Sequence, residues 1–560
     1  MTDRKRIEII YNSFFKKYTI QLICILFLLI FSTSIAFLDN LLNKYLIDEI
    51  IIAKKFEFFI IFILLFIGLN LFCIILSFII GRWNLTLTQN CSISMRKHLL
   101  NCIQMSRMID ILKLNLSNYM VLMMDDIAVV SNFFSNVIIG NIVSIFSVIL
   151  MFIFVLYYSK IIAYLILFFS ILQVITSVLF SNKIKKNQND IKTVTSEHIK
   201  KIDINYRNLP FIKSFLLYSK VMQDYISTLN KIKGVAYNNF NIEFSLNSIL
   251  KIIVLIRNVI IISIGCYSIK NDTLTLGVFV ILINLSESIR TTFSQIVLAN
   301  VQIQSFKVSV NRLFNVLELD KELEIIDSKR LVSINDERIR KIKFIDVGFS
   351  YNKTDNNILN NFNANLTVDK VNIIIGKSGQ GKSTLANILL GLFKIDSGDV
   401  LFNEKSISDL NVNDLRSNIS ICFQDDYFWG DTIYQNFDLI DEKVNNDKIN
   451  YILDIVEAKK FINNLPDGIH TKIGEVMNNL SGGELKRISL AMTLLKEAQI
   501  YIFDESFTNV DYVMRNKIFR NITNYLNGKI VIVITHDENL YEGLDVNLID
   551  VVKNSGEAYV

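Results

Sequence analysis

The sequence is poor in the residues that break helices, bind metals or cross-link chains. Its 560 residues include 20 glycines, 2 prolines and 4 histidines. So little glycine and proline argues against a loop-rich all-β or collagen-like chain and favours long helices. The 6 cysteines show no CxxC spacing and fall mostly in apolar runs. A disulfide framework or a zinc site is therefore not expected.

Charged residues are also few. Asp, Glu, Lys and Arg make up 20% of the chain, whereas hydrophobic residues make up 51%. This composition excludes disorder and argues against an ordinary soluble protein. The formal net charge of +5 is small, and we attribute it to membrane topology rather than to nucleic-acid binding. The sequence thus predicts an integral membrane protein with a further domain attached.

Six apolar stretches are long enough to cross a bilayer as helices, which takes about 20 mostly apolar residues. They are residues 19–38, 56–80, 131–157, 161–180, 246–269 and 275–298. We interpret the first as a retained span. It is too long for the apolar core of a signal peptide, and no convincing small-residue cleavage site follows it.

Lysine and arginine are concentrated on one side of these spans. They occur in the N-terminal tail and in segments 81–130 and 181–245, whereas the other connections are short or charge-balanced. By the positive-inside rule, both termini are expected in the cytoplasm, with the protein in the cell membrane. The two long segments contain almost no turn residues, so we expect them to continue the membrane helices well beyond the lipid.

The composition changes after the last span. The sequence predicts a transmembrane domain over residues 1–318, a charged linker over residues 319–340 and a second domain over residues 341–560. In this second domain, short β-branched runs alternate with helical patterns. That alternation predicts an α/β fold around a mostly parallel sheet.

A phosphate-binding loop is the strongest motif of the second domain. Residues 376–384 read GKSGQGKST, which fits GxxxxGK[ST] between a predicted strand and a predicted helix. In such a loop, Lys382 would neutralise the β- and γ-phosphates and Ser383 would bind Mg²⁺. The nucleotide-binding residues expected here are Gly376, Lys377, Ser378, Gly379, Gln380, Gly381, Lys382, Ser383 and Thr384. The expected fold class is a multi-pass α-helical membrane domain of six transmembrane helices with long cytoplasmic extensions, followed by an α/β P-loop NTPase domain.

A second apolar strand ends in two carboxylates. Residues 500–505 read IYIFDE, which places Asp504 and Glu505 at the C-terminal end of that strand. Taken alone, this pair would be an acidic strand end in solvent. Beside a P-loop, Asp504 is expected to hold Mg²⁺ and Glu505 to orient or deprotonate an attacking water.

Residues 480–484 read LSGGE and precede a helical pattern. Ser481 and Glu484 fit a capping box, a purely structural explanation, but the paired glycines leave bare backbone that suits a phosphate. This segment resembles the LSGGQ signature of ATP-binding-cassette (ABC) proteins, and the resemblance extends over the whole chain. Six spans followed by one cassette resemble an ABC half-transporter of the exporter type. The residues expected at the nucleotide from this segment are Ser481, Gly482, Gly483 and Glu484.

The resemblance implies roles for four further residues. Tyr351 matches the aromatic residue that stacks on adenine, and Gln424 matches the glutamine that joins the metal site to the membrane domain. Asp511 matches the loop that links two ATP sites, and His536 matches the histidine that contacts the γ-phosphate. The implied catalytic residues are Glu505, His536 and Gln424, and the implied magnesium ligands are Ser383, Gln424 and Asp504.

The family also implies ATP and Mg²⁺ as cofactors and a dimer, homomeric or heteromeric, as the working unit. Each ATP would lie between the P-loop of one cassette and the signature segment of the other. Closure on ATP would open the membrane halves outward, and hydrolysis would reset them. Five residues depart from the family pattern: Glu484 replaces the usual Gln, Asn509 and Val510 replace the commoner Ala-Leu, and Asp426 and Asp431 replace a Pro and a Gly. These changes weaken the case for a fast ATPase but not for an ATPase.

Charged residues within the last two spans are candidate cargo contacts. Arg257 and Glu287 each lie about 20 Å from the outer end of their span, at about 1.5 Å per residue. An unpaired charge at that depth costs roughly 3 kcal/mol or more, so a mutual pair or a wet cavity is expected. Arg290 lies nearer the cytoplasm. A structural ion pair and a substrate path through these three residues are both open interpretations.

The expected function is ATP-driven export of an amphipathic or hydrophobic substrate, such as a drug-like compound, a lipid or a peptide. Composition alone indicates a bacterial source. Import by an exporter fold, for example of metal chelates, is one alternative. An ATP-gated channel or regulatory membrane protein is another, which the presence of Glu505 and His536 disfavours. The six spans argue against a soluble cassette ATPase acting on nucleic acid.

Overall fold

The computed structural model divides into two compact units. The first comprises Met1–Leu99 and Ser117–Leu317, and the second comprises Leu100–Leu116 and Glu318–Val560. The residues that the structure describes are 3–114, 116–322, 337–351, 358–377, 379–441, 445–474, 480–508, 510–537, 540–541, 543–552 and 554.

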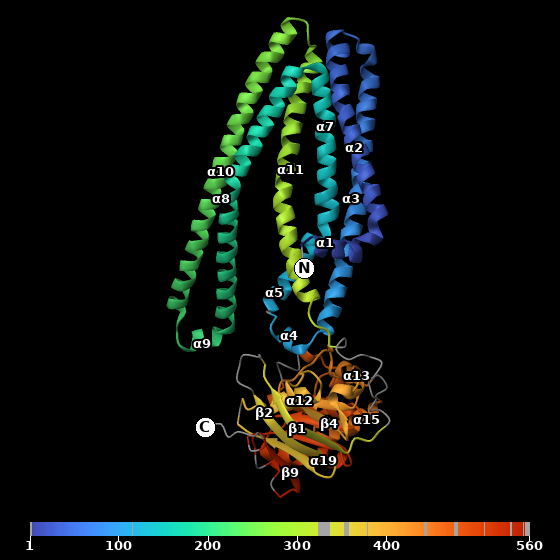
Figure 1. The fold of residues 1–560 in the computed structure, drawn as a ribbon, viewed down its shortest axis with the longest axis vertical. Helices are drawn as coiled ribbons and strands as arrows, with labels where there is room; N and C mark the ends of the chain where they lie inside the picture. The colour runs from blue at the N-terminus through green and yellow to red at the C-terminus, as the bar shows by residue number, and fades with distance from the viewer. Residues whose placement is uncertain are drawn as a thin grey trace. The chain divides into compact units, whose positions relative to one another are not determined.

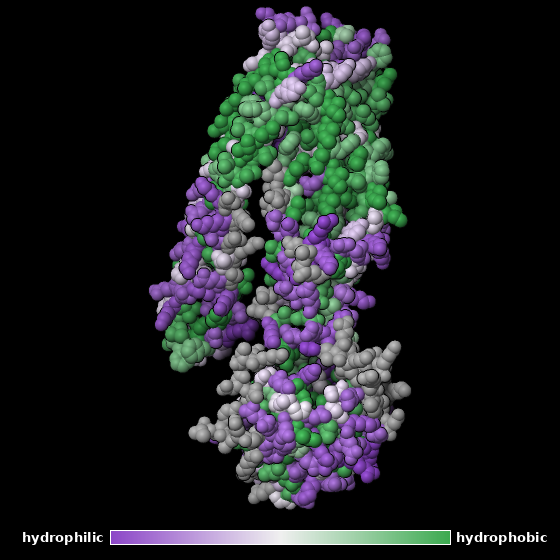
Figure 2. Space-filling view, viewed as in Figure 1, coloured by the Kyte–Doolittle hydropathy of each residue, from purple (hydrophilic) through white to green (hydrophobic). Residues whose placement is uncertain are grey.

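Long helices make up the first unit (Figure 1). They are α2 (Thr19–Tyr45), α3 (Phe59–Gln104), α7 (Gly140–Tyr158), α8 (Lys160–Arg207), α10 (Tyr218–Lys270) and α11 (Leu276–Leu317). In the described chain, 6 helical segments are long and apolar enough to cross a membrane, which confirms the predicted number of spans. Figure 2 shows a broad band of hydrophobic side chains over these helices, with hydrophilic side chains beyond both edges.

Shorter helical segments join these six. The α-helical ones are α1 (Asp3–Ile10), α4 (Met108–Leu112), α5 (Leu116–Val121), α6 (Ile127–Asn132) and α9 (Leu209–Ser214). Wider π-helical turns occur at Tyr11–Phe15, Leu46–Ile52, Leu122–Asp126 and Phe133–Ile139. The last two alternate with α6 and lead into α7, so the chain is helical from residue 122 to residue 158.

Three helices are far longer than a bilayer requires. Helices α3, α8 and α10 contain 46, 48 and 53 residues. Each is therefore about 70–80 Å long, against roughly 30 Å of hydrocarbon. The predicted continuation of the membrane helices is confirmed across segment 181–245. In segment 81–130 it holds as far as Gln104, where α3 ends.

Helices α8 and α10 lie side by side over much of their length (Figure 1). Beyond their apolar parts, four polar pairs join them. These pairs are Asn187–Asn239, His198–Tyr225, Lys201–Asp224 and Lys231–Glu197, at 2.8, 2.9, 2.8 and 3.3 Å. The short helix α9, with Pro210 in its first turn, connects the two. Proline suits this position because the first turn of a helix does not need its N–H.

The second unit contains two β-sheets. An antiparallel sheet has the order β2-β1-β4-β5, and a parallel sheet has the order β6-β7-β8-β3-β9. The strands are β1 (Lys341–Phe349), β2 (Leu359–Thr367), β3 (Val371–Ile375), β4 (Ser397–Phe402), β5 (Lys405–Ser406), β6 (Ile419–Cys422), β7 (Ile500–Asp504), β8 (Ile530–Ile534) and β9 (Val546–Asp550). The predicted α/β fold is confirmed. The structure also contains a separate antiparallel sheet, which the strand pattern in the sequence did not distinguish from the parallel one.

The helices of this unit include α12 (Lys382–Leu389), α13 (Val412–Ser417), α14 (Ile433–Asp438), α15 (Asn446–Ile455), α16 (Lys459–Asn463), α18 (Gly482–Leu495) and α19 (Tyr512–Tyr525). The parallel register aligns Ile374 of β3 and Asp504 of β7 with Ile534 of β8. Because parallel strands point the same way, the segments that follow β3, β6, β7 and β8 leave the sheet at one edge. That edge carries the candidate site.

Residues 100–116 belong to the second unit, although the sequence analysis placed them in the transmembrane domain. The physical reason is packing. Met108 and Ile109 of α4 lie against a hydrophobic core formed by the antiparallel sheet, α12 and the parallel sheet.

The predicted linker, residues 319–340, is held at its start. Glu322 pairs with Arg416 at 2.6 Å, and its N–H donates to the carbonyl oxygen of Met105 at 2.7 Å. Residues 323–336 lie outside the described part of the chain.

Candidate nucleotide-binding site

The loop between β3 and α12 has the backbone form that phosphate binding requires. Gly379 and Gly381 have φ angles of +84° and +87°, which residues with a Cβ rarely adopt. Lys382 is buried, and its Nζ donates to the carbonyl oxygens of Gly376 and Lys377 at 2.8 and 3.0 Å. The loop backbone thus surrounds the ammonium group, which could exchange these carbonyls for phosphate oxygens. Among the predicted loop residues, Ser378 lies outside the described chain.

Tyr351 lies beside this loop. Its hydroxyl is 3.2 Å from Oγ1 of Thr384 on α12, and its ring packs edge-on against Phe349 and Phe393. The ring remains partly exposed. This position is compatible with stacking on a base whose phosphates occupy the loop.

Asp504, at the end of β7, is a buried carboxylate that lacks a full set of partners. Its side chain accepts a hydrogen bond from Ser383, yet Oδ1 has no hydrogen-bond partner among the described residues. Burial raises the pKa of Asp504 above its ordinary value. The Ser383 hydrogen bond opposes this rise, and the neighbouring Glu505 carboxylate adds to it.

A buried oxygen without a partner, next to a hydroxyl group, is the arrangement that a hard cation completes. Ser383 and Asp504 therefore fit Mg²⁺ and would hold it here. The chemistry supplied by Mg²⁺ held at these two residues would be neutralisation of the negative charge of the ATP phosphates. Gln424, the third predicted ligand, directs its amide nitrogen toward Glu505 rather than toward Asp504.

Replacing Asp504 with Asn is expected to stabilise the nucleotide-free protein while abolishing Mg²⁺-dependent hydrolysis. Because burial raises the pKa of Asp504, the ionised carboxyl costs folding free energy at every pH above that pKa. We expect a gain of about 1–3 kcal/mol at neutral pH that shrinks as the pH falls through the pKa of the folded carboxyl. Thermal unfolding of both proteins without Mg²⁺, from neutral to acidic pH, measures this. A lower unfolding midpoint for Asp504→Asn at neutral pH would contradict it.

Glu505 is held in a backbone conformation that residues with a side chain seldom take. Its φ is +46°, and its N–H donates to the carbonyl oxygen of Ile534 at 3.0 Å. Such strain persists where the surrounding structure imposes it, often at functional sites. Gln424 Nε2 donates to Glu505 Oε2 at 3.1 Å, and His536 Nδ1 lies 3.7 Å from Glu505 Oε1. The three predicted catalytic residues are therefore neighbours at one edge of the parallel sheet.

The Ser481–Glu484 segment forms the N-terminus of α18. Its capping box is present: Ser481 Oγ accepts from the Glu484 N–H at 3.4 Å, and Glu484 Oε2 accepts from the Ser481 N–H at 2.9 Å. Glu484 Oε2 also accepts from the Ser481 hydroxyl at 2.8 Å. Glu484, which replaces the usual Gln of the signature, thus has a local role in capping α18. Among the described residues, no hydrogen bond or ion pair joins Ser481, Gly482, Gly483 or Glu484 to the P-loop of the same chain.

Asp511, expected to link two ATP sites, is the N-cap of α19, where its side chain accepts from the Val513 N–H at 3.2 Å. Capping alone explains an aspartate at this position. Among the described residues, the Asp511 side chain bonds to its own helix, and no hydrogen bond joins it to the P-loop.

Lys486 on α18 is a residue that sequence reasoning missed. Its side chain is 3% exposed, and its Nζ donates to the carbonyl oxygens of Phe423 and Gln424 at 3.0 and 2.7 Å. The same Nζ lies 3.0 Å from Asp426 Oδ1. Lys486 thus fastens the glutamine segment to the helix that begins with the signature. The sequence contained a signal for this burial: Lys486 lies four residues before Leu490 and therefore on the same, buried side of α18.

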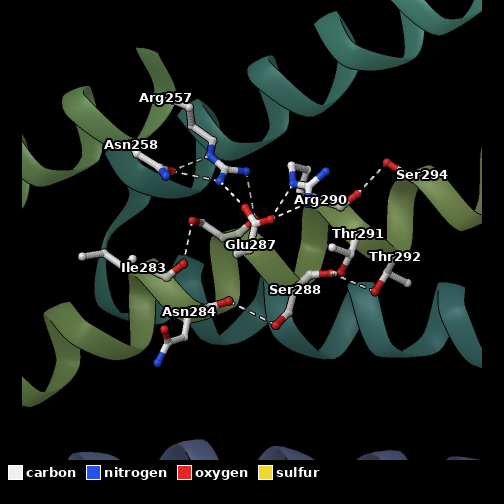
Figure 3. A network of polar contacts seen from close by, with 11 residues as sticks. Arg257, Asn258, Ile283, Asn284, Glu287, Ser288, Arg290, Thr291, Thr292 and Ser294 are labelled. Atoms are coloured by element: carbon white, nitrogen blue, oxygen red, sulfur yellow. Dashed lines mark hydrogen bonds and ion pairs between the residues drawn. The ribbon is translucent and has the colours of Figure 1, made fainter. Parts of the chain in front are cut away.

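The charged residues of the last two membrane helices meet (Figure 3). Arg257 of α10 is 2% exposed, and its Nη2 donates to Glu287 Oε2 at 2.8 Å. It also donates to the Asn258 side chain and to the Ser286 carbonyl oxygen. Glu287 Oε1 accepts from Arg290 Nε at 2.8 Å, and the Arg290 Nη2 group pairs with the same oxygen. The expected ion pair between Arg257 and Glu287 is therefore present, and Arg290 is a third charged residue bound to the same carboxylate.

Two family models match the chain. The ABC transporter transmembrane region matches residues 22–293, and the ABC transporter model matches residues 359–508. Together they cover most of the chain, including the apolar helices and the P-loop. The chain therefore belongs to the ABC transporter family.

Relatives and one solved structure agree with this assignment. A protein of Rickettsia typhi named as an export ATP-binding/permease protein is 35% identical over 237 residues, 41% of each chain. The ATP-dependent lipid A-core flippase of Haemophilus influenzae is 27% identical over 282 residues, 50% of this chain and 47% of that one. Each alignment thus spans less than half of the relative. A bacterial Atm1-family ABC exporter with ATP bound matches the fold with a TM-score of 0.78 at 17% identity, over 96% of this chain and 94% of the other.

Proposed function

We propose that the chain is one half of an ATP-driven exporter that moves amphipathic or hydrophobic molecules across a bacterial cell membrane. The observation that carries this is the meeting of Lys382, Asp504, Glu505, Gln424 and His536 at one sheet edge, in a chain that also has six apolar helices. Binding ATP alone needs no carboxylate positioned beside the metal site. Glu505, with its imposed conformation, supports turnover and therefore transport over passive gating.

The working unit in this proposal is a dimer, with both termini in the cytoplasm. The bare backbone at the start of α18 is a site for a phosphate group, since N–H groups at a helix N-terminus favour anions. Among the described residues, no hydrogen bond or ion pair joins this helix end to the P-loop of the same chain. The phosphate that it binds would therefore belong to ATP held on the P-loop of a second cassette. Mg²⁺ would be held by Ser383 and Asp504, with Gln424 and His536 orienting groups around Glu505.

The direction of transport can be measured in liposomes that contain the full chain. Mg-ATP added outside reaches only molecules whose cassettes face outward. An exporter in that orientation should therefore move a fluorescent phospholipid or drug-like amphipath from the outer face to the lumen. We expect ATP-dependent protection of the probe from a membrane-impermeant quencher, and none with Glu505→Gln. ATP-dependent loss of probe from the lumen would support import, and hydrolysis without movement of any probe would contradict transport.

A further inference from the structure

Within its apolar stretch, α11 turns its polar side outward. Its buried side is aliphatic and includes Ile281, Leu282, Leu285 and Ile289. Its exposed side is polar and includes Asn284, Thr291, Ser294 and Gln295, with Glu287 and Ser288 half-buried between them. The hydroxyl groups of Ser288, Thr291 and Ser294 donate to carbonyl oxygens of their own helix (Figure 3).

This pattern is the reverse of a surface that faces lipid. On the apolar part of α3 in the same unit, the exposed side chains include Ile60, Leu64, Leu71, Ile74 and Phe78. Exposing amide and hydroxyl groups to hydrocarbon costs free energy, because nothing there can hydrogen-bond to them. The polar side of α11 therefore borders water or protein rather than lipid chains.

The charged cluster on this side carries an excess of positive charge. One carboxylate, Glu287, is shared by two guanidinium groups, those of Arg257 and Arg290. No other acidic side chain among the described residues forms an ion pair with either arginine. Arg257 is fully enclosed, and its donors are used by Asn258, Ser286 and Glu287. Arg257 is thus a positioning residue that holds the carboxylate.

Arg290 differs from Arg257 in both exposure and bonding. Its side chain is 25% exposed, and its Nη1 makes no hydrogen bond to the described residues. A guanidinium group with unused donors on a hydrated face suits an anionic oxygen. It can donate two parallel hydrogen bonds to a phosphate or carboxylate. An anion placed there would also neutralise the excess charge of the cluster.

We propose that Arg290 binds the phosphate or carboxylate group of an acidic amphipath, with the polar side of α11 next to its headgroup. This inference rests on the proposed transport function and names its substrate class. Neutral and cationic amphipaths would leave the excess charge unmatched, so the site should discriminate by headgroup charge rather than by the length of the chain.

Equilibrium binding tests this without relying on ATP turnover. The full chain in phosphatidylcholine nanodiscs would be titrated with radiolabelled dodecyl phosphate and competed with dodecylphosphocholine, dodecyltrimethylammonium and inorganic phosphate. We expect saturable binding that the zwitterionic, cationic and tail-less competitors displace at least about tenfold less well than unlabelled dodecyl phosphate. Arg290→Gln should weaken binding by about tenfold or more, and Arg290→Lys should retain part of it. Lys251→Gln, which removes an exposed cation from α10, should not change it.

Three results would overturn the inference. They are equal affinity for all the dodecyl compounds, equal competition by inorganic phosphate, and an Arg290→Gln protein that binds like the wild type. Failure of the transport proposal would appear separately, as absence of probe movement in the liposomes, whatever the binding experiment shows.

Discussion

The Glu505→Gln protein should hydrolyse ATP at least about a hundredfold more slowly than the wild type, because an acceptor positioned for the proton of the attacking water is lost. The substitution keeps the shape of the side chain and an oxygen that can accept the hydrogen bond from Gln424 Nε2. The P-loop and Asp504 are untouched, so ATP affinity should change little. Phosphate release from the full chain in nanodiscs, together with binding of a fluorescent ATP analogue, measures both quantities.

A residual rate above roughly a tenth of the wild-type rate would contradict a proton-accepting role, since general-base catalysis commonly contributes 10²–10⁴-fold. The matched control is Glu497→Gln, on an exposed carboxylate outside the site, which should leave the rate unchanged. If the wild-type chain alone binds ATP but does not turn it over, the result points to a missing heteromeric partner or to a gating role. Co-expression with a candidate partner then becomes the measurement.

Removing Asp426 should cause a large loss of stability in the second unit. In Asp426→Ala, the Lys486 ammonium would remain almost fully buried with two carbonyl oxygens but no counter-charge. Breaking a buried ion pair on one side costs about 3–5 kcal/mol, and the remaining carbonyl oxygens favour the lower end. For a unit of this size, about 3 kcal/mol lowers the unfolding midpoint by roughly 6–12 °C. Thermal unfolding of the full chain measures it.

Two further variants separate the ion pair from a general effect of charge. The double variant Asp426→Ala with Lys486→Met should be more stable than Asp426→Ala alone, because both charges are then gone. Asp425→Ala removes the adjacent exposed carboxylate and should change the midpoint by no more than about 1–2 °C. If the double variant is no more stable than the single one, the ion pair does not explain the loss.

The arrangement of the candidate nucleotide site was largely predictable because its residues occur in contiguous motifs. The loop residues around Lys382 and the strand end at Asp504 and Glu505 each need only a few neighbouring positions. The rule that parallel strands share one carboxyl edge then brings them together. His536 and Gln424 each lie two residues beyond the end of a strand of that sheet, but their roles were implied by the family resemblance rather than by a local motif.

Contacts between distant segments were not predictable in this way. Asp426 departs from the family pattern, but nothing local in the sequence indicates that it pairs with Lys486 across the fold. The assignment of α4 to the second unit depends on Met108 and Ile109, two ordinary apolar residues whose partners lie far along the chain. The long helices were predictable for the opposite reason: absence of proline and glycine is a local property.

The pairing of α8 with α10 has a mechanical consequence. Helix α8 contains neither glycine nor proline, and four polar pairs prevent it from sliding along its neighbour. Two rods fastened in this way resist bending far better than one. About 50 Å of α10 extends past the part that the lipid needs, so a tilt of about 10° would displace its far end by roughly 9 Å. The pair can thus act as a rigid lever that turns a small rotation at one end into a large displacement at the other.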